Sequence, residues 1–188
     1  MFSIISGLPG SGKSTMTRYL KETFGINHIS TVVDHTTVEI HAPGDSYYFL
    51  INDELKYRLA EKYRGGDFIL ERGVESTYGY ISAHDQIFGT RDIELFEQWK
   101  SKHYLELPTP YKFIHFVIDE GLSIHRRYPS GFTGNEGLWT NQNFLRVMEE
   151  ATVNFIRTTY PKEKVSFIDA SKPFSEVKSK VKAILNLE

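Results

Sequence analysis

The sequence contains no cysteine, which excludes disulfide bonds, thiol catalysis and cysteine-based zinc sites. The formal net charge is only −2, so no overall basic field favours a nucleic-acid duplex or an anionic membrane. No apolar run approaches the roughly 20 residues that span a bilayer. A glycine-rich motif begins six residues after Met1 and leaves no room for a signal peptide. These absences favour a soluble, cytoplasmic protein without a membrane partner.

Two motifs of other function classes are absent as well. No [NT]-K-x-D segment occurs, which argues against a GTP-specific switch protein. The histidines form no i,i+4 pair on a predicted helix, so we interpret them as structural or solvent-facing. With 188 residues, 40% of them hydrophobic, we expect one globular domain over residues 1–188 with a sizeable core.

The strongest positive signal is the segment Gly7–Thr15, which fills the P-loop pattern G-x-x-x-x-G-K-[ST]. Apolar residues predict a strand before it, and 13–24 reads as a helix after it, as this pattern requires. Backbone N–H groups and a helix N-terminus then hold phosphates, Lys13 reaches the β- and γ-phosphates, and Ser14 holds Mg²⁺. The sequence therefore predicts binding of a nucleoside triphosphate. The residues predicted to bind ATP here are Gly7, Pro9, Gly10, Ser11, Gly12, Lys13, Ser14 and Thr15.

Short apolar strands alternate with helices along the rest of the chain. We expect strands near 28–33, 68–70, 113–118 and 165–169, and helices near 45–64, 76–87, 91–102, 124–127, after Thr140 and after Pro173. The helix near 45–64 is predicted from an apolar stripe at Tyr48, Ile51, Leu55 and Leu59. This alternation predicts an α/β fold whose parallel sheet is covered on both faces.

Ligands of such sheets bind at the carboxyl ends of the strands, where acidic residues gather in this sequence. These residues are Asp34, Glu71, Asp119 and Asp169. A carboxylate at Glu71 can hold Mg²⁺, and Arg72 offers a fork to a phosphate or hydroxyl oxygen. A structural ion pair at the strand end is the alternative for Glu71 and Arg72.

The segment Glu71–Tyr80 resembles the thymidylate kinase motif Asp-Arg-Tyr-x-x-Ser-x-x-Ala-Tyr-Gln and the Glu-Arg-Ser motif of deoxyribonucleoside kinases. The P-loop and the segments 47–53, 118–119 and 167–171 follow in that family's order, so the resemblance spans nearly the whole chain. It implies a three-layer P-loop NTPase fold with a five-stranded parallel sheet in the order 2-3-1-4-5. It also implies an acceptor pocket between the helices of Tyr47 and Tyr80, and an arginine-bearing lid at about 125–139.

The resemblance also implies roles for single residues. Arg126 and Arg127 precede the glycine-rich stretch as lid arginines do, and would neutralise charge on the transferred phosphoryl group. Lys172 lies in a turn that would border the ATP base. The residues implied to contact the acceptor are Tyr48, Phe49, Asn52, Arg72, Ser76 and Tyr80, although the aromatic ones suit a core equally well.

Four positions bear on the nature of the acceptor. Asp34 matches the proposed general base of the nucleoside kinases, which a hydroxyl acceptor needs and an anionic phosphate does not. A cap on the next turn is the structural alternative for Asp34. Glu71 replaces the Asp usual in thymidylate kinases. Ile81 and Glu54 stand where thymidylate kinases have a Gln near the pyrimidine and an Arg on the acceptor phosphate, so an acceptor phosphate is expected to be absent or held differently.

Several functions remain open at this point. The leading hypothesis is ATP-dependent phosphorylation of a nucleoside or nucleotide. Its acceptor is either a free deoxynucleoside or a nucleoside monophosphate. One alternative is phosphorylation of the hydroxymethyl group of 5-hydroxymethyluracil in phage DNA, which would place the protein in a host cytoplasm. Another is a P-loop ATPase or regulatory ATP-binding protein without a small acceptor. Members of the family are often homodimers through helices that flank the core.

Overall fold

The computed structural model describes residues 2–30, 45–62, 66–127 and 136–188. The sequence-predicted base, Asp34, lies outside these ranges, and so do residues 128–135 of the expected lid. In the described part of the chain, no helix has the length and apolar character needed to cross a membrane.

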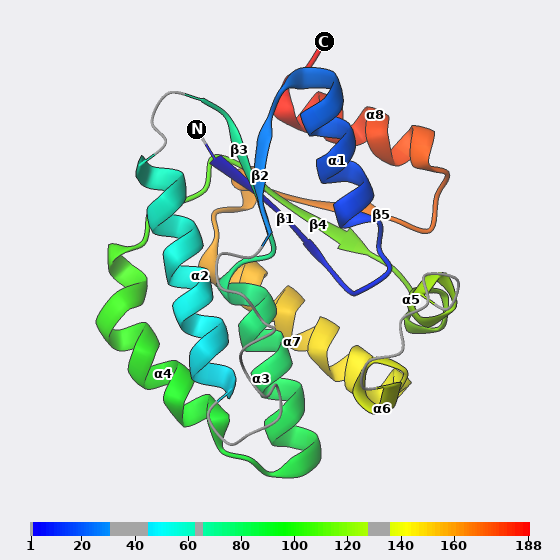
Figure 1. Cartoon of the computed structure of the whole chain (residues 1–188). Coiled ribbons are helices and arrows are strands. Elements are labelled where there is room, and N and C mark those ends of the chain that lie inside the picture. The colour runs from blue at the N-terminus through cyan, green and yellow to red at the C-terminus, as the bar shows by residue number, and fades with distance from the viewer. Residues whose placement is uncertain (1, 31–44, 63–65, 128–135) are drawn as a thin grey trace.

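Five parallel strands form one sheet in the order β2-β3-β1-β4-β5, which confirms the predicted strand order (Figure 1). The strands are β1 (Phe2–Gly7), β2 (Asn27–Ile29), β3 (Phe68–Glu71), β4 (Phe113–Val117) and β5 (Val165–Asp169). The central strand β1 is buried along its whole length, because helices cover both faces of the sheet. Its register pairs Ile4 with Leu70 on one side and with Phe113 on the other, so the carboxyl ends of these strands lie at one edge.

The helices form the two outer layers. They are α1 (Lys13–Phe24), α2 (Asp45–Lys62), α3 (Val74–Phe88), α4 (Asp92–His103), α5 (Glu120–Arg127), α6 (Glu136–Trp139), α7 (Gln142–Thr159) and α8 (Phe174–Leu185), with short 3₁₀ turns at Tyr104–Glu106 and Lys162–Lys164. Figure 1 shows α1 and α8 on one face of the sheet, and α2, α3, α4 and α7 on the other. The three-layer α/β fold expected from the sequence is therefore present.

Two sequence expectations about helices are wrong. Helix α7 is capped by Asn141 rather than by Thr140, and the Asn141 side chain accepts a hydrogen bond from the Phe144 N–H at 3.1 Å. Asparagine caps helices at least as well as threonine. Because Thr140 and Asn141 are adjacent, the sequence pattern alone does not show at which of them the helix begins. The predicted apolar stripe of α2 does not form the buried face, because Ile51 and Leu55 are each 38% exposed. The buried face of α2 instead combines the apolar residues Leu50, Tyr57 and Ala60 with the polar residues Asn52, Asp53 and Lys56.

Gly79 sets how closely α3 and α7 pack. A Cβ atom at this position would overlap the Thr152 hydroxyl and lie 2.7 Å from the Met148 carbonyl oxygen. We expect Gly79→Ala to push the two helices apart and lower the free energy of unfolding by about 1–3 kcal/mol, measured by urea denaturation. Gly137→Ala is the matched control, because a Cβ there meets no atom within 4 Å. Equal stability of Gly79→Ala and the wild type would contradict this close packing.

Candidate functional site

The loop between β1 and α1 has the geometry of a phosphate cradle. Gly7 and Gly10 have φ angles of 137° and 79°, which L-residues with a side chain rarely adopt. A Cβ at either position would lie 2.5 Å from a backbone oxygen, of Phe116 and of Ser123 respectively. Gly12 precedes α1 in a left-handed conformation, so the helix N-terminus faces the loop. Gly7 and Gly10 are therefore required by both conformation and space, and Gly12 by conformation alone.

Lys13 lies across this loop. Its ammonium group donates to the carbonyl oxygens of Gly7 and Leu8 at 2.9 and 2.8 Å, and to Ser11 Oγ at 3.3 Å. Burial, with the positive charge of Arg72 as a further cause, lowers the pKa of Lys13 well below its ordinary value. Arg127 adds to this lowering of the Lys13 pKa. A phosphate bound here would offset the repulsion among these cations.

Ser14 and Glu71 form the pair predicted to hold Mg²⁺. Ser14 Oγ donates to Glu71 Oε1 at 2.7 Å, and Thr17 Oγ1 donates to Glu71 Oε2 at 3.5 Å. A hydroxyl and a carboxylate are hard oxygen ligands, and Mg²⁺ in nucleotide sites takes the rest of its shell from phosphates and water. The residues present therefore fit Mg²⁺ between Ser14 and Glu71. Bound there, the ion would neutralise charge on the phosphates.

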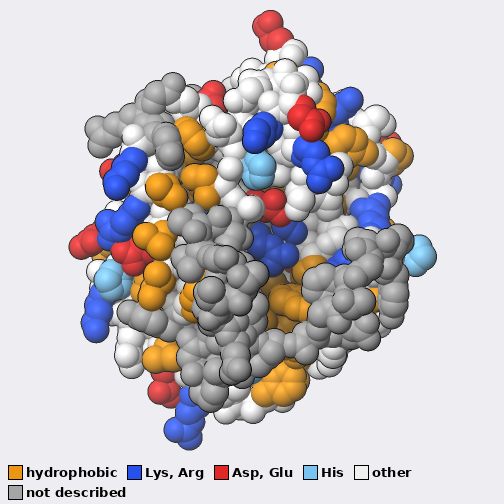
Figure 2. Space-filling view, viewed as in Figure 1, with side chains coloured by type: hydrophobic (Ala, Val, Ile, Leu, Met, Phe, Trp, Pro, Cys, Tyr) orange, Lys and Arg blue, Asp and Glu red, His pale blue; other side chains and the backbone are white. Residues whose placement is uncertain are grey.

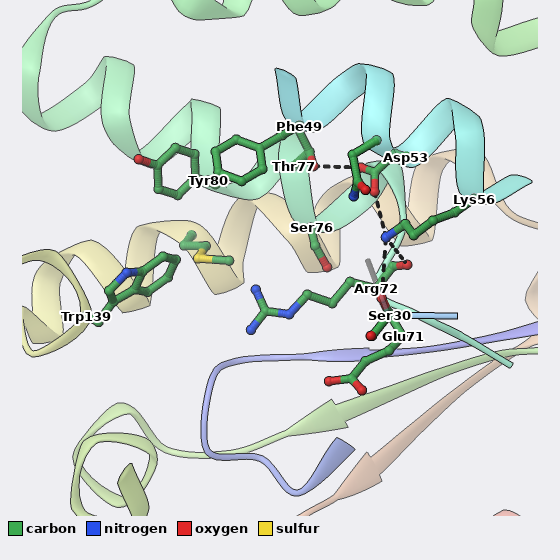
Figure 3. A pocket seen from close by; sticks show the side chains of 13 residues that line it. Ser30, Phe49, Asp53, Lys56, Glu71, Arg72, Ser76, Thr77, Tyr80 and Trp139 are labelled. Atoms are coloured by element: carbon green, nitrogen blue, oxygen red, sulfur yellow. Dashed lines mark hydrogen bonds and ion pairs between the residues drawn. The ribbon is translucent and has the colours of Figure 1, made fainter. Parts of the chain in front are cut away.

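A cavity of about 250 Å³ opens beside this pair. In the space-filling view, basic side chains lie in a hollow near the centre of this face, with an acidic side chain beside them (Figure 2). The cavity is lined by Ser30, Phe49, Asn52, Asp53, Lys56, Glu71, Arg72, Gly73, Ser76, Thr77, Tyr80, Trp139 and Met148 (Figure 3). A second hollow, alongside α1, is lined by Ser14 and Thr17 and shares Ser30 and Glu71 with the first. Glu71 therefore stands between the phosphate loop and the cavity.

Of the six residues expected to contact the acceptor, five line the cavity. Tyr48 is not among the lining residues, and its ring contacts the Phe49 ring edge-on, with the ring centres 6.0 Å apart. The sequence analysis missed Asp53, Lys56, Thr77, Trp139 and Met148. The i, i+3, i+4, i+7 spacing of residues 49, 52, 53 and 56 is a signal that could have found the first two. No local sequence pattern predicts Trp139 and Met148, because tertiary packing brings these residues to the cavity.

Arg72 has an unusual backbone conformation for a residue with a side chain. Its φ angle is 63°, and its N–H donates to the Ile5 carbonyl at 2.9 Å. The guanidinium group extends into the cavity (Figure 3). Burial lowers the pKa of Arg72, although the charges of Glu71 and Glu75 oppose this shift. A partly desolvated guanidinium in a cavity binds an oxygen anion well, because the anion replaces missing solvation.

The two arginines before the glycine-rich stretch face different parts of the site. Arg126 donates to the Ala170 and Ser171 carbonyls at 2.8 and 3.4 Å, in the turn expected to border the ATP base. Arg127 donates to the Trp139 carbonyl at 3.2 Å, and its guanidinium lies 5.8 Å from the centre of the Trp139 ring. Burial and the charge of Arg72 lower the pKa of Arg127. Arg127 is therefore near the phosphate site, whereas Arg126 contacts the turn at Ala170 and Ser171.

Several other residues singled out by sequence have structural partners. Lys172 is half-exposed, and its Nζ lies 3.8 Å from Asp169 Oδ2. Asp119 Oδ1 accepts from the Leu122 N–H at 3.1 Å, and Asp169 Oδ1 accepts from the Ser171 N–H at 2.9 Å. Hydrogen bonds from Ser171 lower the pKa of Asp169. These two strand-end carboxylates therefore shape turns next to the site.

Two departures from the thymidylate kinase pattern lie away from the cavity lining. Glu54 accepts two hydrogen bonds from Arg58, at 2.8 and 2.6 Å, on the outer side of α2. Ile81 is fully buried in the core. Neither residue lines the cavity, and the expectation drawn from Glu54, that an acceptor phosphate is absent or held differently, stays a prediction.

Glu75 is a buried carboxyl group directly behind the cavity. Its Oε1 accepts from the Gly73 N–H at 2.9 Å and from Ser76 Oγ at 3.1 Å, and Ser76 Oγ lies 3.0 Å from Ser6 Oγ. Burial, with the charge of Asp53 as a second cause, raises the pKa of Glu75. The folded state therefore keeps the Glu75 proton to a higher pH than the unfolded state does.

This shift predicts how stability depends on pH. Below the unfolded-state pKa, about 4.3, both states are protonated and Glu75 carries no penalty. As the pH rises towards the higher folded-state pKa, the unfolded state releases its proton first and stability falls. We expect Glu75→Gln, which mimics the protonated carboxyl, to gain stability relative to the wild type between acidic and neutral pH in urea denaturation. A constant difference across this range would contradict the raised pKa of Glu75.

No family model matches this sequence, and no curated protein matches it either. Solved structures do. A deoxyadenosine kinase from M. mycoides with bound dATP superposes with a TM-score of 0.81 at 15% identity, over 99% of this chain and 100% of that chain. The same enzyme with the products dCMP and a flexible dCDP gives 0.80 at 13% identity, over 99% of both chains.

A thymidylate kinase from Candida albicans is also similar. Its TM-score is 0.68 at 16% identity, over 98% of this chain and 90% of that chain. Identities this low establish likeness of fold. The chain therefore has the fold of the P-loop nucleoside and nucleotide kinases that its sequence motifs resemble.

Proposed function

We propose that this protein transfers a phosphoryl group from ATP to a nucleoside or nucleotide. The observation that carries the proposal is the place of Glu71. It accepts the 2.7 Å hydrogen bond from Ser14 of the phosphate loop and also lines the neighbouring cavity. A donor phosphate on the loop and an acceptor in the cavity would meet at this carboxylate. An ATP-binding regulator has no need of such a second site.

The chain's own residues supply the parts that phosphoryl transfer needs. The acceptor oxygen bonds to the γ-phosphorus, the bond from that phosphorus to the ADP oxygen breaks, and the acceptor hydroxyl loses its proton. The loop and Lys13 hold the donor phosphates, and Ser14 and Glu71 hold Mg²⁺. The Arg72 guanidinium extends into the cavity and Arg127 donates to the Trp139 carbonyl, and both would neutralise charge on the transferred group. We assign the proton to Asp34, in keeping with its match to the proposed general base of the nucleoside kinases, although β2 ends at Ile29, before the predicted strand end at residue 33.

The lining of the cavity favours an aromatic base as part of the acceptor. The Tyr80 and Trp139 rings lie 5.8 Å apart and nearly parallel, and Phe49 contacts Tyr80 edge-on at 5.6 Å. Asn52 adds an amide to this wall. The volume of about 250 Å³ is close to the lower end of ligand pockets, about 300 Å³. We therefore propose a deoxynucleoside or a thymidylate-type monophosphate as acceptor.

The test is a panel assay of ADP release with Mg²⁺ and ATP. The acceptors are the free deoxynucleosides, their monophosphates and DNA containing 5-hydroxymethyluracil. We expect release to rise steeply with one small acceptor. A slow rate that no acceptor changes would instead favour a regulatory ATPase, and a response to the DNA alone would favour the base-modifying kinase.

Asp34 allows the two small acceptors to be distinguished. We expect Asp34→Asn to lower the transfer to a hydroxyl acceptor by about 10²–10⁴-fold, since no other assigned group takes the proton. Transfer to a monophosphate would change little, because that oxygen is already anionic near neutral pH. The measurement is the steady-state rate with each acceptor, and Asp67→Asn, at an exposed carboxylate, is the control. Nearly full activity of Asp34→Asn on a hydroxyl acceptor would contradict the base assignment.

A further inference from the structure

One face of α2 continues from the acceptor cavity to the end of β3. Phe49, Asn52, Asp53 and Lys56 are spaced i, i+3, i+4 and i+7, so they share this face. Phe49 lies near Tyr80 at one end of the cavity, whereas Asp53 and Lys56 lie beside Glu71 and Arg72 (Figure 3). The same helix therefore touches the acceptor side and the catalytic side of the proposed site.

The ammonium group of Lys56 has three N–H donors and three acceptors. It lies 2.8 Å from Asp53 Oδ1, 3.0 Å from the Arg72 carbonyl oxygen and 3.4 Å from the Glu71 carbonyl oxygen. Asp53 Oδ2 accepts in turn from Thr77 Oγ1 at 2.6 Å. Lys56 is only 2% exposed. An ammonium whose donors are all engaged has none left for a substrate phosphate, although its side chain lines the cavity.

The bonds to Lys56 act where the backbone is under strain. Arg72 has a left-handed conformation with φ 63°, which costs a residue with a side chain about 1–2 kcal/mol. Its N–H is fixed by the Ile5 carbonyl of β1, and its carbonyl is fixed by Lys56. Both peptide groups of Arg72 are therefore held from opposite sides, one by the sheet and one by α2.

We propose that Lys56, held by Asp53, is a positioning residue for Glu71 and Arg72. By fixing two consecutive carbonyls, it turns the Glu71 carboxylate towards Ser14 and the Arg72 guanidinium into the cavity. This inference rests on the proposed function and adds to it a group that contacts neither substrate. Stability alone does not require a buried pair here, because neutral residues of similar volume often replace such pairs at no cost.

The test uses the double variant Asp53→Asn/Lys56→Met, which removes both charges together and leaves no buried charge unpaired. The amide oxygen introduced at position 53 can still accept from Thr77, so only the bonds from Lys56 are lost. We expect kcat to fall by about 10²-fold, the cost of a misplacement near 1 Å. The control is Glu54→Gln/Arg58→Met, which removes the exposed ion pair of the same helix.

A second measurement needs no acceptor and separates this inference from the proposed function. Calorimetry gives the ATP affinity with and without Mg²⁺. We expect the double variant to keep the wild-type affinity without Mg²⁺, because the loop is intact, and to lose most of the gain that Mg²⁺ gives. That result supports the inference even if no acceptor in the panel is phosphorylated. The inference would be overturned if Mg²⁺ raised the ATP affinity of the double variant as much as that of the wild type and kcat were also unchanged. Failure of the double variant to fold would overturn it as well, because it would show that the pair has a structural role.

Discussion

Replacing Lys13 with alanine is expected to lower the rate of phosphoryl transfer by about 10³-fold or more. Its ammonium is the cation of the loop, held over it by the Gly7 and Leu8 carbonyls at 2.9 and 2.8 Å. The substitution removes this positive charge from the place where the donor phosphates bind. Neither neighbouring arginine takes its place, because the Arg72 guanidinium extends into the cavity and the Arg127 guanidinium donates to the Trp139 carbonyl.

The measurement is the steady-state rate of ADP release with the best acceptor of the panel. Because Lys13 also holds loop carbonyls, Lys13→Met is assayed beside Lys13→Ala, since it keeps the buried aliphatic stem. Lys102→Ala removes an exposed lysine of α4 and is the control for charge. A rate for either Lys13 variant within about tenfold of the wild type would argue against the P-loop as donor site.

The second large effect is expected at Arg72. We expect Arg72→Lys to lower kcat by about 10²-fold with little change in the KM for ATP. Lysine keeps the charge but loses the planar fork that can bind two oxygens at once. The left-handed backbone aims the side chain into the cavity, so the shorter reach of the ammonium changes its position as well as its geometry.

Arg91 offers a matched control for this substitution. It has the same φ angle of 63°, is exposed, and precedes α4 away from the cavity lining. Arg91→Lys therefore changes the same residue type in the same backbone conformation. If both variants lost activity equally, backbone strain would explain the Arg72 effect. If neither did, the role of Arg72 in transfer would be refuted.

The parts of the fold that sequence predicted are those encoded locally. The P-loop pattern depends on spacing within nine residues, Gly7 to Thr15, and the buried strands are recognised by short apolar runs. The alternation of strands and helices predicts a parallel sheet, whereas the strand order 2-3-1-4-5 was implied by the motif resemblance and is confirmed by the structure. Phe49, Asn52, Ser76 and Tyr80 were placed at the cavity through a motif resemblance rather than through physical pattern.

Helix α2 shows why the rest could not be predicted. An apolar stripe normally marks the buried face of a helix, yet Ile51 is exposed while Asp53 and Lys56 are buried. The pair is tolerated inside because its polar atoms are satisfied by each other, by Thr77 and by strand-end carbonyls. Those partners come from other parts of the chain, so the hydrophobic periodicity of α2 alone does not predict them.

The crowding of cations at the phosphate loop has a consequence for the thermodynamics of the protein. Arg72 and Arg127 lower the pKa of Lys13, and Arg72 lowers that of Arg127, so the ligand-free fold carries an electrostatic cost. An anion that binds only the folded state removes part of that cost and adds its own binding free energy to the folding equilibrium. The melting temperature should therefore rise with ATP and, to a smaller extent, with inorganic phosphate. The repulsion among these cations therefore couples the stability of the fold to the binding of an anion.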